Sequence, residues 1–199
     1  MEEGLKTIRI KGKVCLLGDV AVGKTSLIRR FVFDTFEDKY ISTIGAKVTK
    51  KSLKIPYPEF ERLIDLTLMI WDIMGQHAER LPSTLTQYEH YVPPKNYFRN
   101  AKAAIIVCDI TREDTFNNMK KWITHLFELS GEVPVILTGN KLDLLSETDF
   151  PISKISDYAK ETKGETILTS AKSGENVEKM FYTIGDMIVK EAVDWEQEI

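Results

Sequence analysis

The sequence has few cysteines, no long apolar run and no excess of basic charge. Its 199 residues include two cysteines, Cys15 and Cys108, each within an apolar segment. Such thiols are predicted to be reduced and buried, and they exclude a disulfide-stapled secreted domain. No apolar run approaches the roughly 20 residues of a membrane-spanning helix. The net charge of −3 at pH 7 argues against nucleic acid as a main partner.

Signals for targeting and lipid attachment are missing at both ends of the sequence. The first residues, 1-MEEGLKTIRIKGK-13, hold no apolar signal core and no glycine at position 2. The last residues, 194-DWEQEI-199, contain no cysteine for prenylation. We therefore expect a cytoplasmic, monomeric protein without its own lipid anchor, which reaches membranes only through partners.

Apolar runs that suit strands alternate along the chain with segments of helical periodicity, which predicts a parallel sheet covered on both faces. We expect a single α/β domain over 1–199, of the P-loop NTPase type with three α/β/α layers, a six-stranded sheet, one antiparallel edge strand and five main helices. Strands are predicted at 8–18, 46–55, 65–72, 103–109, 133–139 and 166–169. Helices are predicted at 24–34, 114–130, 153–163 and 176–195, and Pro93–Pro94 argues against one continuous helix through 76–100.

Between the first predicted strand and helix lies 18-GDVAVGKT-25, which fits the phosphate-loop pattern G-x-x-x-x-G-K-[ST]. Gly18 and Gly23 free the backbone to wrap around an anion, and the N-terminus of the following helix adds partial positive charge. Lys24 can reach the outer phosphates, and the Thr25 hydroxyl can bind Mg²⁺. This loop alone predicts a nucleoside triphosphate without naming the base.

Polar segments at two further strand ends indicate which base the nucleotide carries. The segments 140-NKLD-143 and 170-SAK-172 each follow a predicted strand, so both fall at the edge of the sheet where ligands bind. A carboxylate at Asp143 can accept hydrogen bonds from N1–H and the 2-amino group of guanine. Adenine has no such pair of donors, so the pattern favours guanine.

Taken together, these motifs resemble the small GTPases of the Ras superfamily over about residues 8–192. The matching motifs are 18-GDVAVGKT-25, 43-TIG-45, 72-DIMGQ-76, 140-NKLD-143 and 170-SAK-172. A likeness to the Rab group is carried by 42-STIG-45, 70-IWDIMGQ-76 and 97-YFRNAKAAIIVCDIT-111.

The resemblance implies a molecular switch that binds GTP or GDP with Mg²⁺ and hydrolyses GTP to GDP. Gln76 would orient the attacking water as the catalytic side chain. The Mg²⁺ ligands would be Thr25, Thr43 and, through a water, Asp72. The remaining implied nucleotide contacts are Asp19, Val20, Ala21, Val22, Gly23, Lys24, Thr25, Ser26, Phe36, Tyr40, Thr43, Gly75, Asn140, Lys141, Asp143, Ser170, Ala171 and Lys172. Of these, Phe36 is open to a second interpretation as an ordinary core residue.

The sequence departs from the family pattern at several positions. Val20 and Met74 stand where many relatives carry small residues, which predicts slow hydrolysis and a weak response to an activator that donates an arginine. The insertion near 56–65 is expected to lengthen the hairpin turn between the strands predicted at 46–55 and 65–72, and the insertion near 81–95 is expected to lengthen switch II (74–96). Longer loops often bind partner proteins, although variation in loop length without any function explains the two insertions equally well.

The resemblance further implies effector, exchange-factor and GTPase-activating proteins as partners, which would bind through switch I (37–47) and switch II (74–96). Two rival functions stay open at this stage. One is a GTP-binding regulatory or adaptor module with little hydrolysis, favoured by Val20 and Met74. The other is an ATP-using P-loop enzyme, against which Asn140 and Asp143 count.

Overall fold

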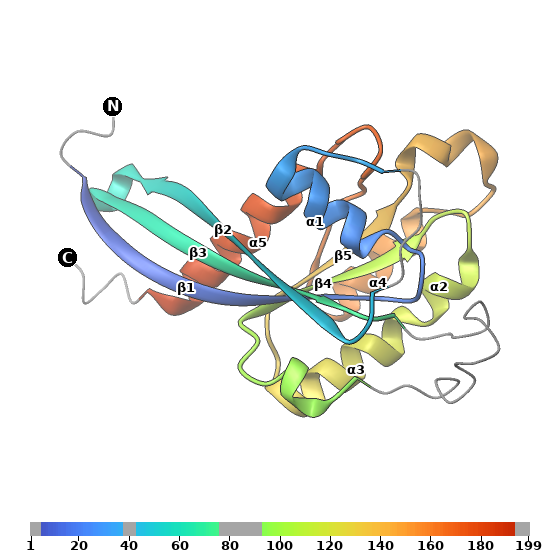
Figure 1. The fold of residues 1–199 in the computed structure, drawn as a ribbon, viewed down its shortest axis with the longest axis horizontal. Coiled ribbons are helices and arrows are strands. Elements are labelled where there is room, and N and C mark those ends of the chain that lie inside the picture. The colour runs from blue at the N-terminus through green and yellow to red at the C-terminus, as the bar shows by residue number, and fades with distance from the viewer. Residues whose placement is uncertain (1–4, 38–42, 76–92, 194–199) are drawn as a thin grey trace.

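The computed structural model describes residues 5–37, 43–75 and 93–193 (Figure 1). Six strands form one sheet in the order β2-β3-β1-β4-β5-β6. In chain order, the strands are β1 (Lys6–Leu17), β2 (Ala46–Tyr57), β3 (Arg62–Ile73), β4 (Ala103–Asp109), β5 (Val135–Asn140) and β6 (Glu165–Thr166). Only β2 pairs antiparallel, and the other four pairings are parallel, which confirms the predicted sheet with one antiparallel edge strand.

Five α-helices occur in the described part of the chain, as predicted. They are α1 (Lys24–Phe33), α2 (Glu113–Asn117), α3 (Met119–Ser130), α4 (Ser153–Glu161) and α5 (Val177–Ala192). Short 3-10 turns lie at Pro58–Phe60, Lys95–Tyr97 and Leu142–Glu147. No helix among the described residues is long and apolar enough to cross a membrane.

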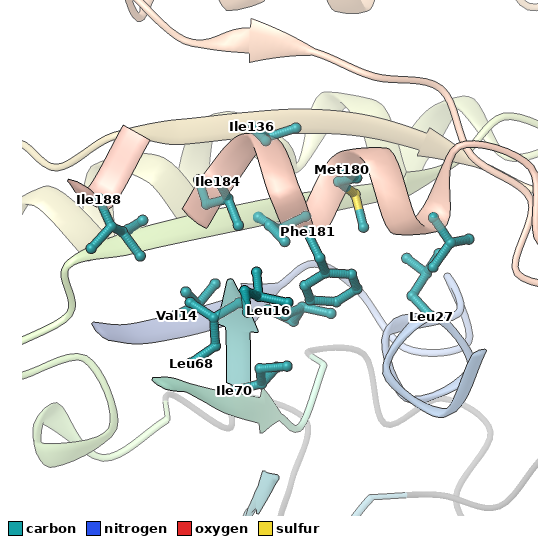
Figure 2. Close-up of a cluster of buried hydrophobic side chains, with 14 of the residues drawn as sticks. Val14, Leu16, Leu27, Leu68, Ile70, Ile136, Met180, Phe181, Ile184 and Ile188 are labelled. Carbon is teal, nitrogen blue, oxygen red and sulfur yellow. The ribbon is translucent and has the colours of Figure 1, made fainter. Parts of the chain in front are cut away.

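Helices cover both faces of the sheet because successive side chains of each buried strand point to opposite faces. From β1, Val14 and Leu16 pack on one face with Phe181 of α5 and Leu27 of α1 (Figure 2). Their neighbours Cys15 and Leu17 pack on the opposite face with α3 and α4. Cys15 and Cys108 are both free and buried, as predicted.

Several expected boundaries are wrong, and the two largest differences lie at 114–130 and 56–65. The predicted helix over 114–130 is divided into α2 and α3 at Asn118, whose amide side chain donates to Asp19 in the phosphate loop. The insertion at 56–65 lengthens the two strands of the hairpin, and the turn between them is short. The strands run on because Ile64 and Leu66 continue the buried face of β3 and pair in register with Ile8 and Ile10. Most of the second predicted insertion, 81–95, lies outside the described residues.

Candidate functional site

The phosphate loop joins β1 to α1 through two glycines that no other residue could replace without strain. Gly18 has φ 140°, and a Cβ atom there would lie 2.1 Å from the Val107 carbonyl oxygen. Gly23 has φ 102°, and a Cβ atom there would lie 2.2 Å from the Asn140 amide nitrogen. Both positions therefore need glycine for its positive φ and for the close approach of a neighbour.

Lys24 is buried at the start of α1, and its side chain folds back over the loop. Its Nζ donates to the carbonyl oxygens of Gly18 at 2.8 Å and Asp19 at 2.7 Å. Burial lowers the pKa of Lys24 to about 8, although the carboxylates of Asp72 and Asp19 oppose this change. No described carboxylate forms an ion pair with this buried ammonium, and carbonyl groups carry only partial charge, so a phosphate group would stabilise it.

Three oxygen-bearing side chains predicted as metal ligands meet beside Lys24. The Thr25 hydroxyl donates to Asp72 Oδ2 at 2.6 Å, and the Thr43 hydroxyl lies 3.4 Å from the same oxygen. Asp72 Oδ1 is buried and has no hydrogen-bond partner among the described residues. Burial raises the pKa of Asp72 despite these hydroxyls and the nearby Lys24. A hard-oxygen cluster with an orphaned buried carboxylate oxygen fits a Mg²⁺ ion.

Asn140, at the end of β5, joins three of the predicted motifs. Its Nδ2 donates to the Val22 carbonyl in the phosphate loop at 2.8 Å. Its Oδ1 accepts a hydrogen bond from the Ala171 backbone N–H at 3.1 Å. The fold therefore brings together segments that lie far apart in the sequence, with a buried amide at their junction.

The loop after β6 is braced from two sides. The Ser170 hydroxyl donates to Asp143 Oδ1 at 2.5 Å, which leaves the rest of the exposed Asp143 carboxylate free to face a base. Arg30 of α1 donates to the backbone carbonyls of Ala171 at 3.1 Å and Lys172 at 2.8 Å. Sequence reasoning missed Arg30, because a helical arginine gives no sign of which distant loop it contacts.

Asp19 lies in the phosphate loop, but its side chain points away from the predicted site. Its two carboxylate oxygens accept hydrogen bonds from Asn118 at 2.7 Å and from the Trp122 indole at 3.0 Å. Any contact between Asp19 and a nucleotide would therefore be made by the backbone of Asp19. The side chain instead ties the phosphate loop to α3.

The described end of switch I and the described start of switch II meet beside the phosphate loop. The Met74 backbone N–H donates to the Gly45 carbonyl at 2.9 Å, which joins the start of switch II to the end of switch I. Gly75 touches the peptide between Asp19 and Val20, where a Cβ atom would lie 2.4 Å from the nearest backbone carbon. Gln76 and Tyr40 lie outside the described residues, so their predicted roles stay predictions.

The other predicted contacts lie around the same loops. Val20, Ala21 and Ser26 are partly exposed, and Ala21 has a left-handed backbone. Phe36 packs against the core cluster of α1 and α5, so it keeps both of its interpretations. Lys141 also has a left-handed backbone, and its Nζ lies 2.6 Å from Asp109 Oδ2.

Asp109 and Arg112 are further members of the site that sequence reasoning missed. Asp109 ends β4 and pairs in register with Asn140, so it lies at the same edge of the sheet. The signal available in the sequence was an acidic residue that closes the continuous apolar run 103-AAIIVC-108. Arg112 carried no comparable signal, because its contact with the phosphate loop depends on the turn after β4.

Comparisons with known proteins agree with this geometry. The family model described as the Ras family matches residues 13–190. The chain is 37% identical to the Ras-related protein Rab-31 of Rattus norvegicus over 177 residues, which cover 88% of this chain and 82% of that protein. It is 35% identical to Rab-22A of Canis lupus familiaris, with the same coverage. It is also 35% identical to human Rab-21 over 90% of this chain and 73% of that protein.

Proposed function

The chain belongs to the Ras family, and we propose that the loops around Lys24 and Asn140 form its guanine-nucleotide site. As a small GTPase, the protein binds guanine nucleotide, hydrolyses GTP to GDP and acts as a nucleotide-dependent switch. This membership removes the alternative of an ATP-using enzyme.

The observation that carries the proposal is the junction at Asn140. One buried amide binds the backbone of both the phosphate loop, at Val22, and the loop after β6, at Ala171. A nucleotide has its base and its phosphates at opposite ends, so its site needs the two loops at a fixed separation. Asp143 lies exposed next to this junction, where its carboxylate can accept the two guanine donors.

At the phosphate end, Thr25, Thr43 and Asp72 would hold Mg²⁺, since their oxygens converge and Asp72 Oδ1 has no other described partner. When bound, Mg²⁺ neutralises charge on the phosphate oxygens. Lys24 Nζ would exchange its two carbonyl acceptors for phosphate oxygens. The backbone N–H groups of the loop would bind the same anion.

The switch follows from two contacts with the terminal phosphate. Thr43 and the Gly75 backbone N–H would bind the γ-phosphate, so its loss would release 37–47 and 74–96. Effectors, exchange factors and GTPase-activating proteins would distinguish the two states through these segments. The likeness to Rab proteins supports intracellular trafficking as the pathway.

Hydrolysis is tested by single-turnover release of phosphate from GTP and Mg²⁺, with Gln76→Leu compared with the unchanged protein. Gln76 would orient the attacking water, so we expect slow release from the unchanged protein and about tenfold less from the variant. Equal rates above background would remove Gln76 from catalysis. Tight GTP binding with no turnover in either protein would favour a binding module.

Base selection is tested by the isosteric change Asp143→Asn. An amide offers a donor to the 2-position oxygen of xanthine, so we expect the preference to move from GTP towards xanthosine triphosphate by about 100-fold or more. Asp149→Asn changes another exposed aspartate in the following segment and serves as the matched control. An Asp143→Asn variant that keeps the full GTP preference would show that Asp143 does not read the base.

A further inference from the structure

One buried carboxylate, Asp109, binds two cations from different parts of the site. Its Oδ2 lies 2.6 Å from Lys141 Nζ and 3.0 Å from Arg112 Nε. Its Oδ1 accepts from the backbone N–H and the hydroxyl of Thr111 at 3.0 and 2.7 Å. Burial alone would raise the pKa of Asp109, but hydrogen bonds from Lys141 and Thr111 outweigh it and lower that pKa. The carboxylate is therefore ionised and fully satisfied at neutral pH.

Arg112 extends this group to the phosphate loop. While its Nε donates to Asp109, its Nη2 donates to the Val20 carbonyl at 2.8 Å. The planar guanidinium suits this arrangement, because its donors have a fixed separation and direction. Val20 adjoins the peptide that Gly75 touches. Arg112 thus holds the part of the loop that Gly75 contacts.

The need to neutralise Asp109 does not explain why Arg112 also donates to the Val20 carbonyl. Lys141 already supplies one positive charge to this single negative charge, and its Nζ is the nearer of the two cations. What Arg112 adds is a hydrogen bond to a backbone carbonyl of the phosphate loop. The chain Lys141–Asp109–Arg112–Val20 therefore runs beside the Asn140–Val22 contact as a second link between the same two loops.

We propose that Asp109 and Arg112 are positioning residues that lock the base-binding loop to the phosphate loop and thereby slow nucleotide release. The proposal rests on the function proposed above, in which Asp143, two residues after Lys141, faces the base and the loop that contains Val20 binds the phosphates. Opening either loop would require the guanidinium to leave an acceptor. Release of the base and release of the phosphates would consequently be coupled.

The test measures dissociation of fluorescently labelled GDP in Mg²⁺ buffer from the unchanged protein, Arg112→Ala and Arg112→Lys. We expect Arg112→Ala to speed dissociation about tenfold, the usual effect of losing a charged hydrogen bond. Arg112→Lys keeps the positive charge but lacks the planar set of donors of the guanidinium group. We therefore expect its GDP dissociation rate to be close to that of Arg112→Ala. Arg9→Ala is the matched control, because the Arg9 side chain is 85% exposed on β1.

A double-mutant cycle separates positioning from simple structural support. If the network acts as one unit, Arg112→Ala together with Lys141→Ala should speed dissociation by less than the product of the two single effects. Thermal unfolding of each variant is measured alongside. Arg112→Ala with a lowered melting temperature but unchanged dissociation would overturn the proposal. So would strictly multiplicative effects in the cycle, or full rescue by Arg112→Lys.

The outcome for the unchanged protein distinguishes this proposal from the one on which it rests. If the unchanged protein binds no labelled GDP, the proposed nucleotide site fails. If it binds tightly and Arg112→Ala releases GDP at the same rate, the site stands and only the positioning role fails.

Discussion

The hydroxyl oxygens of Thr25 and Thr43 lie 3.0 Å apart and face the same oxygen of Asp72. Thr25 belongs to the first turn of α1, whereas Thr43 precedes β2, so the contact joins the phosphate loop to switch I. Two hydroxyl groups next to a buried carboxylate form a site that a cation would complete. The contact therefore places Thr43 where it can respond to what the phosphate loop binds.

Replacing Thr43 with alanine should separate GTP binding from GDP binding. The change removes the hydroxyl that we propose as a Mg²⁺ ligand in the γ-phosphate state and leaves Thr25, Lys24 and the loop backbone in place. We expect GTP affinity to fall about tenfold in Mg²⁺ and GDP affinity to change by about twofold at most. Competition binding with both nucleotides measures this difference.

Thr7→Ala removes an exposed hydroxyl from β1 and serves as the control for that measurement. It should leave both affinities unchanged. Equal losses of GTP and GDP affinity in Thr43→Ala would mean that Thr43 supports the site as a whole and does not sense the γ-phosphate.

Gly75→Ala should hinder hydrolysis because the added methyl group has no room. Its Cβ would lie 2.4 Å from the carbonyl carbon of Asp19 and 2.5 Å from the Val20 nitrogen, both backbone atoms. Switch II must then move away from the phosphate loop, and overpacking of this kind commonly costs about 1–3 kcal/mol. We expect single-turnover hydrolysis to fall about tenfold or more while GDP affinity is kept.

Gly131→Ala provides the comparison for Gly75. Gly131 has a left-handed backbone, with φ 77°, and among the described residues beyond its chain neighbours no atom lies within 4 Å of an added Cβ. The Gly131→Ala variant should be somewhat less stable towards unfolding and should hydrolyse GTP at the unchanged rate. Normal hydrolysis in Gly75→Ala would show that switch II acts without close contact at this point.

The sequence was sufficient to predict the elements with strong local patterns. Continuous apolar runs such as 103-AAIIVC-108 identified the buried strands, and the glycines at 18 and 23 identified the phosphate loop. The strand-end rule then placed Asn140 beside that loop, a placement that its hydrogen bond to Val22 confirms. These predictions succeeded because each depends on spacing along the chain or on the known direction of parallel strands.

Contacts that depend on side-chain direction could not be predicted in this way. Asp19 lies within the motif, yet its carboxylate binds Asn118 and Trp122 of the neighbouring helical region. Arg112 reaches Val20 across a turn whose geometry has no sequence signature. The break between α2 and α3 could not be predicted either, because helical periodicity continues through Asn118.

Asp109→Asn should reveal a pH-dependent part of the stability. The folded pKa of Asp109 is lowered from 3.8, so folding favours its ionised form. That contribution is present above the unfolded pKa and is lost as the pH falls through the folded pKa. We expect the variant to be less stable by about 2 kcal/mol at pH 7, with the difference closing below about pH 4. Urea unfolding at pH 7, 5, 4 and 3 measures this.

Asp157→Asn is the control for Asp109, since its ion pair with Lys160 lies on the surface. Its effect should stay within about 0.5 kcal/mol at every pH. A constant difference between Asp109→Asn and the unchanged protein down to pH 3 would show that the negative charge of Asp109 is not what stabilises the fold.

Asn140→Ala should weaken both the fold and the nucleotide site, because one amide satisfies groups in two loops. The Val22 carbonyl and the Ala171 N–H would each lose their hydrogen bond to Asn140. A buried polar group left without a partner costs about 1–3 kcal/mol. We therefore expect a clear fall in melting temperature without nucleotide and a loss of GDP affinity of about 100-fold. Asn96→Ala alters an exposed amide and should change neither. If Asn140→Ala lowered the melting temperature but kept its GDP affinity, the junction would support the fold without setting the separation of the two nucleotide-binding loops.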